Sequence, residues 1–76
     1  MILSIQFRAA RALLRWDQKH LAESAGVSLP TIKRMEMSEG EVRGTASNVW
    51  KVQRALEGAG IEFTNDDAPG VRLRRR

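Results

Sequence analysis

The chain has 76 residues, with 13 lysines and arginines, nine acidic residues, one histidine and no cysteine. This length is enough for one small domain with a thin core. The composition excludes disulfides and thiolate metal sites, and a single histidine cannot build a metal cluster, so we expect no cofactor. No apolar run approaches the roughly 20 residues that span a bilayer, and no secretory signal pattern opens the chain. We expect a soluble cytoplasmic protein without membrane partners.

The excess positive charge lies at the C-terminus. Arg72, Arg74, Arg75 and Arg76 supply the whole net charge of +4, because the other nine basic residues balance the nine acidic ones. Such a tail either follows the phosphates of a nucleic acid or is an ordinary solvated chain end, and both interpretations stay open.

An alanine- and leucine-rich stretch from Ser4 to Arg15 predicts the first helix. Ser4 is its expected N-cap. The apolar face is expected to contain Phe7, Ala10, Leu13 and Leu14, with Leu3, Ile5 and Trp16 as flanking core residues. Arg11 lies on the side of this apolar face. A charged residue there requires a partner, and Glu36 is the candidate.

Two short helices joined by a tight turn are predicted next. Asp17 is a good N-cap for the first of them, and Gly26 lies where the chain must leave that helix with positive φ. Ser28 is then the expected cap of the second helix, with Pro30 in its first turn. Because the residue before a proline resists the α region, that helix could instead begin at Pro30 with Leu29 as its cap.

The 100° step of a helix separates two faces on the second of these helices. Its inward face holds Ile32, Met35 and Glu36, and its outward face holds Pro30 and Arg34, flanked by Thr31 and Lys33 and extended by Leu29 and Met37. The outward face has few acids. Arginine is the usual bidentate partner of guanine in the major groove, and apolar side chains contact thymine methyl groups.

Seven positions in this region agree in type and spacing with a known pattern: Gln18, Ala22, Gly26, Val27, Ile32, Met35 and Glu36. They resemble the helix-turn-helix of the phage-repressor-like (XRE or Cro-like) family of bacterial DNA-binding regulators, and the resemblance extends less sharply from about Ser4 to Ala59. It implies a mainly α, lambda-repressor-like bundle of about four or five helices. The helix-turn-helix domain would cover residues 1–60, and residues 61–76 would add a C-terminal β-hairpin and basic tail to the same domain.

The resemblance also implies roles for individual residues. Base reading would fall to Leu29, Pro30 and Arg34, phosphate contacts to Gln18 and Ser28, and a structural ion pair to Arg11 and Glu36. Thr31 and Lys33, which flank Arg34 on the outward face, are further base-reading candidates, and Lys19 and Arg43 are further phosphate candidates. Since the family often has Gln or Ser where Leu29 and Pro30 stand, we expect Arg34 to carry most of the direct readout. Glu39 and Glu41 in the following loop would repel phosphates, so Arg43 is the main phosphate candidate of that loop.

A further helix is predicted from about Ser47 to Ala59, capped by Thr45 or Ser47. Its apolar stripe consists of Val49, Val52, Leu56 and Ala59. Trp50 is one step off the stripe, where a large aromatic side chain either completes the core or marks a partner surface.

The last segment changes its apolar period from 3.6 to 2 residues, which predicts a hairpin. Glu62 would then lie opposite Arg72 or Arg74. Because an isolated two-stranded ribbon is marginal in water, this hairpin must lean on the helices or pair its edge with a second copy. The candidate contacts of a homodimer are Trp50, Ile61, Phe63, Val71 and Leu73.

Two classes of function remain open. The first is a sequence-specific regulator that binds double-stranded DNA, a repressor associated with the bacterial nucleoid, with the helix from about Ser28 to Glu36 in the major groove. The alternative is a protein-interaction module such as the antitoxin of a toxin–antitoxin pair, with a protein partner and with DNA binding secondary. We do not expect an enzyme, because His20 has no nucleophile or glycine-rich phosphate cradle near it in the sequence.

Overall fold

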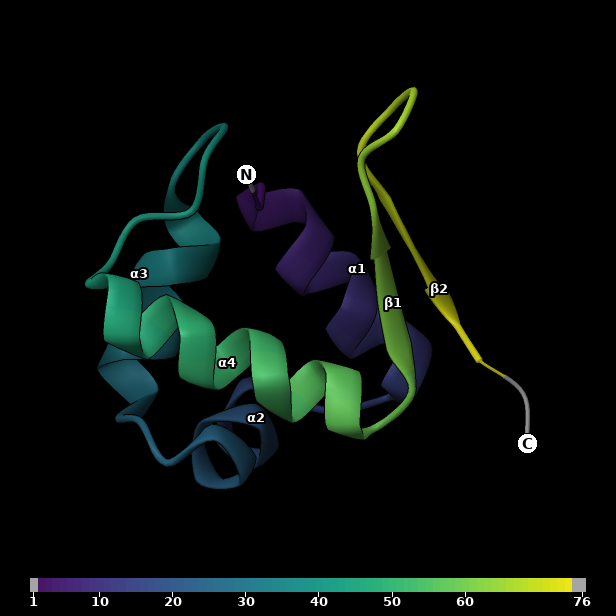
Figure 1. The fold of residues 1–76 in the computed structure, drawn as a ribbon. Coiled ribbons are helices and arrows are strands. Elements are labelled where there is room, and N and C mark those ends of the chain that lie inside the picture. The colour runs from purple at the N-terminus through teal and green to yellow at the C-terminus, as the bar shows by residue number, and fades with distance from the viewer. Residues whose placement is uncertain (1, 75–76) are drawn as a thin grey trace.

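The computed structural model describes residues 2–74 and consists of four helices followed by a two-stranded antiparallel sheet (Figure 1). The elements are α1 (Ser4–Leu14), α2 (Gln18–Ala25), α3 (Leu29–Met37), α4 (Ala46–Gly58), β1 (Ile61–Thr64) and β2 (Gly70–Leu73). The expected mainly α fold with a C-terminal hairpin is confirmed. None of the described helices is long and apolar enough to cross a membrane. Arg75 and Arg76 of the predicted basic tail lie outside the described residues.

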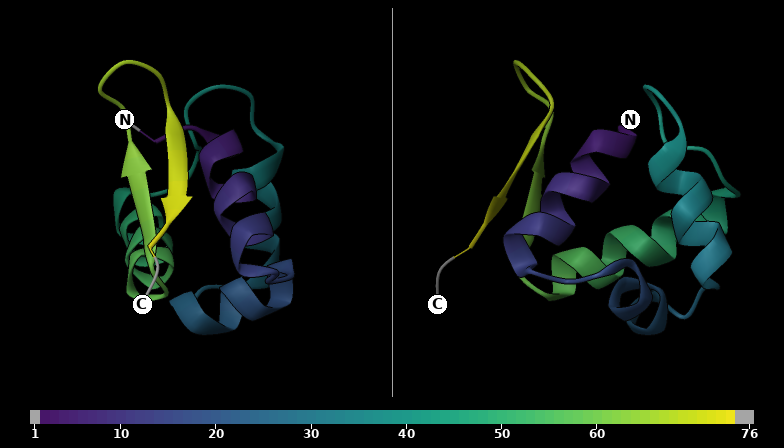
Figure 2. Two further views of the ribbon diagram at one scale, coloured as in Figure 1. Left: turned by 90° about the vertical axis from the view of Figure 1, so that its right-hand side faces the viewer. Right: turned by 180° about the vertical axis from the view of Figure 1, so that it is seen from behind.

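Every helix and the first strand contribute to one apolar core. Its buried members are Phe7, Ala10, Leu21, Ala22, Ile32, Met35, Val52, Leu56 and Ile61. Alternating apolar residues place one face of the hairpin against this core, and the ring of Phe63 meets that of Phe7 edge-on with 6.0 Å between centroids. Figures 1 and 2 place the hairpin and α3 at opposite ends of the molecule. The outward face of α3 is therefore free of the hairpin.

Local side-chain caps define where three of the helices begin. Asp17 accepts a hydrogen bond of 2.7 Å from the backbone N–H of His20 at the start of α2. Ser28 accepts one of 3.2 Å from Thr31 at the start of α3, so Ser28 and not Leu29 is the cap of that helix. At the start of α4, Thr45 caps the helix and Ser47 lies inside it. Each cap satisfies a backbone donor that the helix itself leaves free.

The predicted cap of α1 is wrong. Leu3 is the N-cap residue, and its backbone N–H donates to the side-chain oxygen of Gln6 at 2.8 Å. Ser4 is instead fully buried, and its hydroxyl donates to the carbonyl of Met35 at 2.8 Å. The hydroxyl joins α1 to the end of α3, a contact between segments that local sequence patterns do not reveal.

Two apolar residues of α1 expected in the core are exposed, namely Ile5 and Leu13. Ile5 lies two residues before the buried Phe7, and a 100° step per residue turns it to the opposite side of the helix. Leu13 lies six residues after Phe7, which also turns it well away from the buried side. Only the side of α1 that includes Phe7 and Ala10 faces the other helices.

The hairpin has the expected cross-strand charge pair. Glu62 is opposite Arg72 in the register, and its carboxylate contacts Arg72 at 2.6 Å and Arg74 at 3.1 Å. At the other end of the ladder, the buried side chain of Gln6 donates to the carbonyl of Gly70 at 3.0 Å. The hairpin therefore leans on α1, which answers how a two-stranded ribbon is held in this chain.

Candidate nucleic-acid interface

The turn between α2 and α3 is short and tightly bonded. Gly26 ends α2 with φ of 72°, a left-handed conformation that glycine adopts without a steric penalty. The backbone N–H groups of Gly26 and Val27 both donate to the carbonyl of Ala22, at 2.9 and 3.1 Å. Ser28 then starts α3. Residues 26–28 thus join the two helices, and hydrogen bonds hold the backbone of this turn in place.

The two faces of α3 are separated as the sequence predicts. Ile32, Met35 and Glu36 are buried, with Glu36 only 4% exposed. Four predicted members of the outward face are exposed: Pro30, Lys33, Arg34 and Met37. Leu29 and Thr31 are half-buried, and Leu29 packs against the core, so less of these two side chains is available to a ligand than the sequence interpretation assumed.

The outward face of α3 is basic. The only acidic residue of α3, Glu36, points inward, whereas Lys33 and Arg34 are exposed. Among residues 2–74, neither Lys33 nor Arg34 takes part in an ion pair. Their charges are consequently available to an anionic partner.

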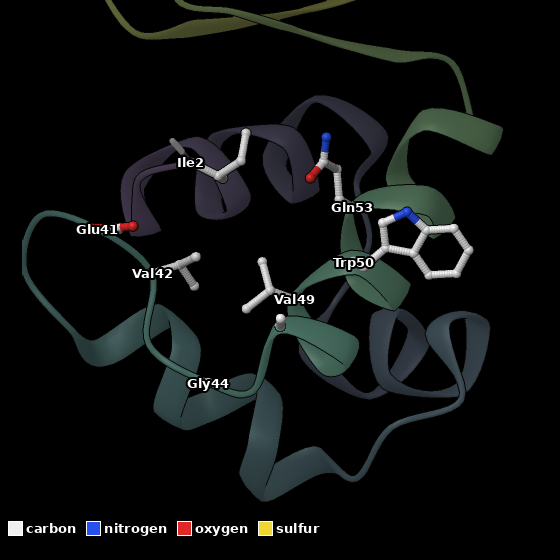
Figure 3. A pocket seen from close by; sticks show the side chains of 8 residues that line it. Ile2, Glu41, Val42, Gly44, Val49, Trp50 and Gln53 are labelled. Atoms are coloured by element: carbon white, nitrogen blue, oxygen red, sulfur yellow. The ribbon is translucent and has the colours of Figure 1, made fainter.

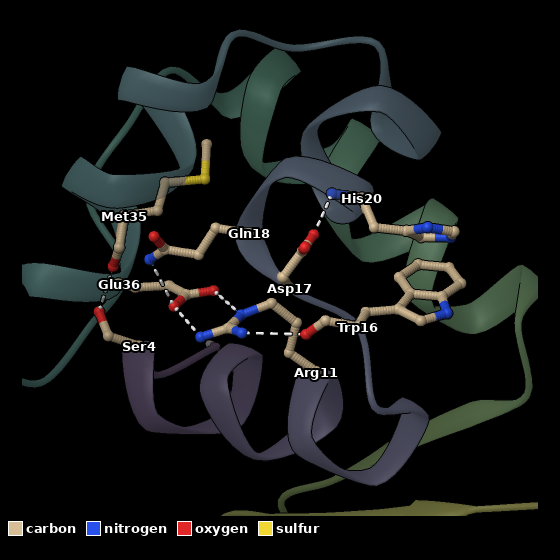
Figure 4. Close-up of polar contacts among 8 residues, drawn as sticks. All are labelled: Ser4, Arg11, Trp16, Asp17, Gln18, His20, Met35 and Glu36. Atoms are coloured by element: carbon tan, nitrogen blue, oxygen red, sulfur yellow. Dashed lines mark hydrogen bonds and ion pairs between the residues drawn. The ribbon is translucent and has the colours of Figure 1, made fainter.

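The predicted pair of Arg11 and Glu36 is present and joins α1 to α3 (Figure 4). Arg11 contacts the carboxylate in a two-pronged arrangement, with Nε 2.7 Å from Oε2 and Nη2 2.8 Å from Oε1. The hydrogen bonds to Glu36, and to a smaller extent its negative charge, raise the pKa of Arg11 above its ordinary value against the opposing effect of burial. The guanidinium therefore stays charged in this half-buried position.

Two further hydrogen bonds extend this pair to the start of α2. Arg11 Nη1 donates to the backbone carbonyl of Trp16 at 3.0 Å, and the side-chain amide of Gln18 donates to Glu36 Oε1 at 3.0 Å. Among the described residues, no buried side-chain polar atom lacks a partner. The network thus fixes α1, the start of α2 and the end of α3 relative to one another.

Gln18 has a role here that sequence reasoning missed. It was expected to contact phosphate, and its amide group is directed at Glu36 in this structure. The only available sequence signal was the nearby inward-facing acid, whose free acceptor positions call for further donors. The contact of Gln18 with a phosphate, through the second N–H of its amide, stays a prediction.

The remaining phosphate candidates lie on the surface near helix ends. Lys19 is exposed in the first turn of α2, and Ser28 is exposed at the start of α3. Free backbone N–H groups at such positions attract phosphate groups. Arg43 is exposed in the loop between α3 and α4. Their contacts with DNA stay predictions.

The candidate dimer contacts divide into two groups. Ile61, Phe63 and Val71 are buried or half-buried against the helices. Leu73 and Trp50 are exposed, Trp50 by 60%. The interpretation that Trp50 completes the core is therefore wrong, because its position on α4 turns it away from Val52 and Leu56.

The part of the chain that the structure describes holds no cluster of metal-ligating side chains. Between residues 2 and 74, no three side chains of His, Cys, Asp or Glu come together as metal ligands. His20 is exposed, and the centroid of its ring lies 4.4 Å from the ring centroid of Trp16.

No protein-family model matches the sequence, and a search among curated proteins finds no match either. What supports a function for this chain is therefore the geometry of α2, α3 and the side chains around them.

Proposed function

We propose that the chain is a sequence-specific regulator that binds double-stranded DNA, with α2 and α3 as a helix-turn-helix and α3 in the major groove. The observation that carries this proposal is the outward face of α3. It presents Lys33 and Arg34 without ion-pair partners among the described residues, and the only acid of the helix is buried. An α-helix fits the major groove of B-DNA, and phosphates and base acceptors both favour such a cationic surface.

Arg34 is the proposed principal reader of bases. Its guanidinium is exposed, and a planar fork of donors matches the two acceptors on the major-groove edge of guanine. Lys33 and Pro30 flank it, and Met37, 82% exposed, extends the same face. Apolar atoms of Pro30 and Met37 suit thymine methyl groups.

Rigid placement of α3 supports sequence reading, because a base contact depends on a position fixed to a fraction of an ångström. The bonds of Glu36 to Arg11 and Gln18 hold the end of α3 against α1 and α2. A bound α3 would therefore lose little conformational freedom.

In this proposal the protein acts as a repressor that occupies its site as a homodimer. Two-fold dimers of helix-turn-helix proteins place their recognition helices about 34–36 Å apart, in successive major grooves. Occupation of such a site excludes other proteins from it, so no additional activity is required for repression.

Fluorescence anisotropy tests the proposal. Wild type, Arg34→Ala and a control, Arg8→Ala, are titrated with duplexes selected from the source genome at several salt concentrations. Arg8 is an exposed arginine of α1. We expect wild type to bind a selected site at least about 10³-fold more tightly than random duplex near about 0.15 M salt. Arg34→Ala should lose about 1–3 kcal/mol at that site, and Arg8→Ala should lose little.

Equal binding of the three proteins to all duplexes would contradict the proposal. If all three proteins bind every duplex with the same affinity and a steep dependence on salt, the binding is to phosphate alone. The sequence-reading role of α3 is then wrong, and the function lies with a protein partner.

A further inference from the structure

An open pocket of about 430 Å³ lies between the N-terminal segment, the loop after α3 and the first turns of α4 (Figure 3). Ile2, Val42 and Val49 provide its apolar surface. Figure 3 places Glu41 and Trp50 on opposite sides of it. The backbone N–H of Val42 donates to the carbonyl of Ile2 at 3.0 Å, which joins two of the walls. The pocket is therefore built into the fold.

Trp50 is the most unusual side chain of this surface. Trp50 is 60% exposed, and the guanidinium of Arg54 lies over its ring, 5.4 Å from the ring centroid. The exposed indole and the adjacent apolar pocket together leave apolar surface that the folded chain does not bury. Tryptophan is among the residues most enriched at the energetic centres of protein interfaces.

We infer that this face binds a second copy of the chain, with Trp50 of each copy seated in the pocket of the other across a two-fold axis. An interface of this kind needs one surface patch to supply both the protruding group and the hollow. Here the indole and the apolar pocket are adjacent. The inference specifies the homodimer of the proposed function, but it does not require DNA binding.

The charges around the pocket fit a second copy. Glu41 lies on one side, and Arg54 lies beside Trp50 on the other side. Between residues 2 and 74, neither Glu41 nor Arg54 has an ion-pair partner. A two-fold rotation that exchanges the two Trp50 side chains brings Arg54 of each copy towards Glu41 of the other. A partner of a single charge sign would match only one side.

The size of the molecule allows such an interface. The solvent-accessible surface area of the chain is 5191 Å². A specific interface buries at least about 500 Å² on each partner, which is roughly a tenth of this area. The apolar face of the hairpin leaves little apolar surface for a second copy, because Ile61, Phe63 and Val71 already pack against the helices.

Sedimentation velocity on the full chain tests the inference without DNA. We expect wild type to form dimers at about 100 μM, a concentration well above a micromolar Kd. Trp50→Ala should raise the Kd of the dimer at least about 30-fold, which is the size of an interface hot spot. Met37→Ala is the matched control, because it removes an exposed apolar side chain of α3 outside the pocket. It should leave the Kd unchanged, and circular dichroism should show both variants folded.

A charge exchange tests the two-fold arrangement itself. Glu41→Arg and Arg54→Glu should each weaken the dimer, and the double variant should recover most of the wild-type affinity. A double variant as weak as the single variants overturns the arrangement.

Two other outcomes overturn the whole inference. A folded wild-type monomer at about 100 μM leaves the pocket to a different protein. A dimer that persists in Trp50→Ala but is lost on deletion of residues 65–76 places the interface at the hairpin edge. Since DNA is absent, none of these results depends on the proposed regulatory function.

Discussion

Replacing Glu36 by alanine removes the acceptor of three hydrogen bonds, two from Arg11 and one from Gln18. Removing one partner of a buried ion pair typically costs about 3–5 kcal/mol, because the other charge stays buried without compensation. The side chain of Glu36 is 3% exposed and that of Arg11 is 22% exposed. Since the remaining guanidinium keeps the carbonyl of Trp16 and can reach water, we expect a loss at the lower end, about 3 kcal/mol.

That loss is large for a domain of this size. Native domains have about 0.05–0.15 kcal/mol of stability per residue, and each kcal/mol shifts Tm by about 4–8 °C in a domain this small. We therefore expect Glu36→Ala to lower Tm by about 12 °C or more. Urea denaturation followed by circular dichroism gives the change in unfolding free energy. Glu39→Ala, which removes an exposed acid from the next loop, should stay within about 0.5 kcal/mol of wild type.

A double-mutant cycle separates the ion pair from side-chain packing. In an Arg11→Met background, Glu36→Ala should cost much less than in wild type, because no guanidinium is left unpaired. An equal cost in both backgrounds, or a loss of only a few tenths of a kcal/mol in wild type, would refute the role assigned to the pair.

The same cycle has a defined pH dependence. Hydrogen bonding to Glu36 raises the pKa of Arg11. The stabilisation from a raised pKa is complete below the ordinary value and is lost only as pH rises through the raised value. The cost of Glu36→Ala should accordingly be the same at neutral and moderately alkaline pH.

Four further substitutions have smaller effects, which the same denaturation assay measures. Gly26→Ala should destabilise by about 1–2 kcal/mol, because φ of 72° strains any residue with a Cβ. Arg15→Gly should stabilise by up to about 1 kcal/mol, because Arg15 already adopts φ of 57°. A change in unfolding free energy of the same sign for both variants would contradict this reasoning. Thr45→Ala should cost about 1 kcal/mol through loss of the α4 cap, and an unchanged stability would mean that Asn48 N–H finds water at no cost. Glu62→Ala should cost at most about 1 kcal/mol, less at high salt, because its arginine partners are largely exposed; a larger, salt-independent loss would argue against a surface pair.

Much of the candidate site could be predicted from the sequence, because it depends on local rules. Gly26 marks a positive φ, and Ser28 followed by Pro30 marks the start of α3. The helical step then assigns Arg34 to the outward face and Glu36 to the inward one. An inward-facing acid on one helix and an inward-facing arginine on another predict a pair, which the structure contains.

Other contacts between distant segments could not be predicted in this way. Ser4 has the residue type of a cap, but the end of α3 comes close enough to accept its hydroxyl proton. Gln6 likewise gave no sequence signal of its partner, the carbonyl of Gly70, which lies at the start of β2. These positions depend on which surfaces meet in three dimensions.

The sequence by itself determined the elements, the turn between α2 and α3 and the two faces of α3, because caps, glycine conformations and apolar periodicity act within a few residues. Only the tertiary structure decided that Trp50 stays exposed and that Ile2 and Val42 form a pocket beside it. Whether an apolar side chain is covered depends on the packing of segments that are far apart in the chain.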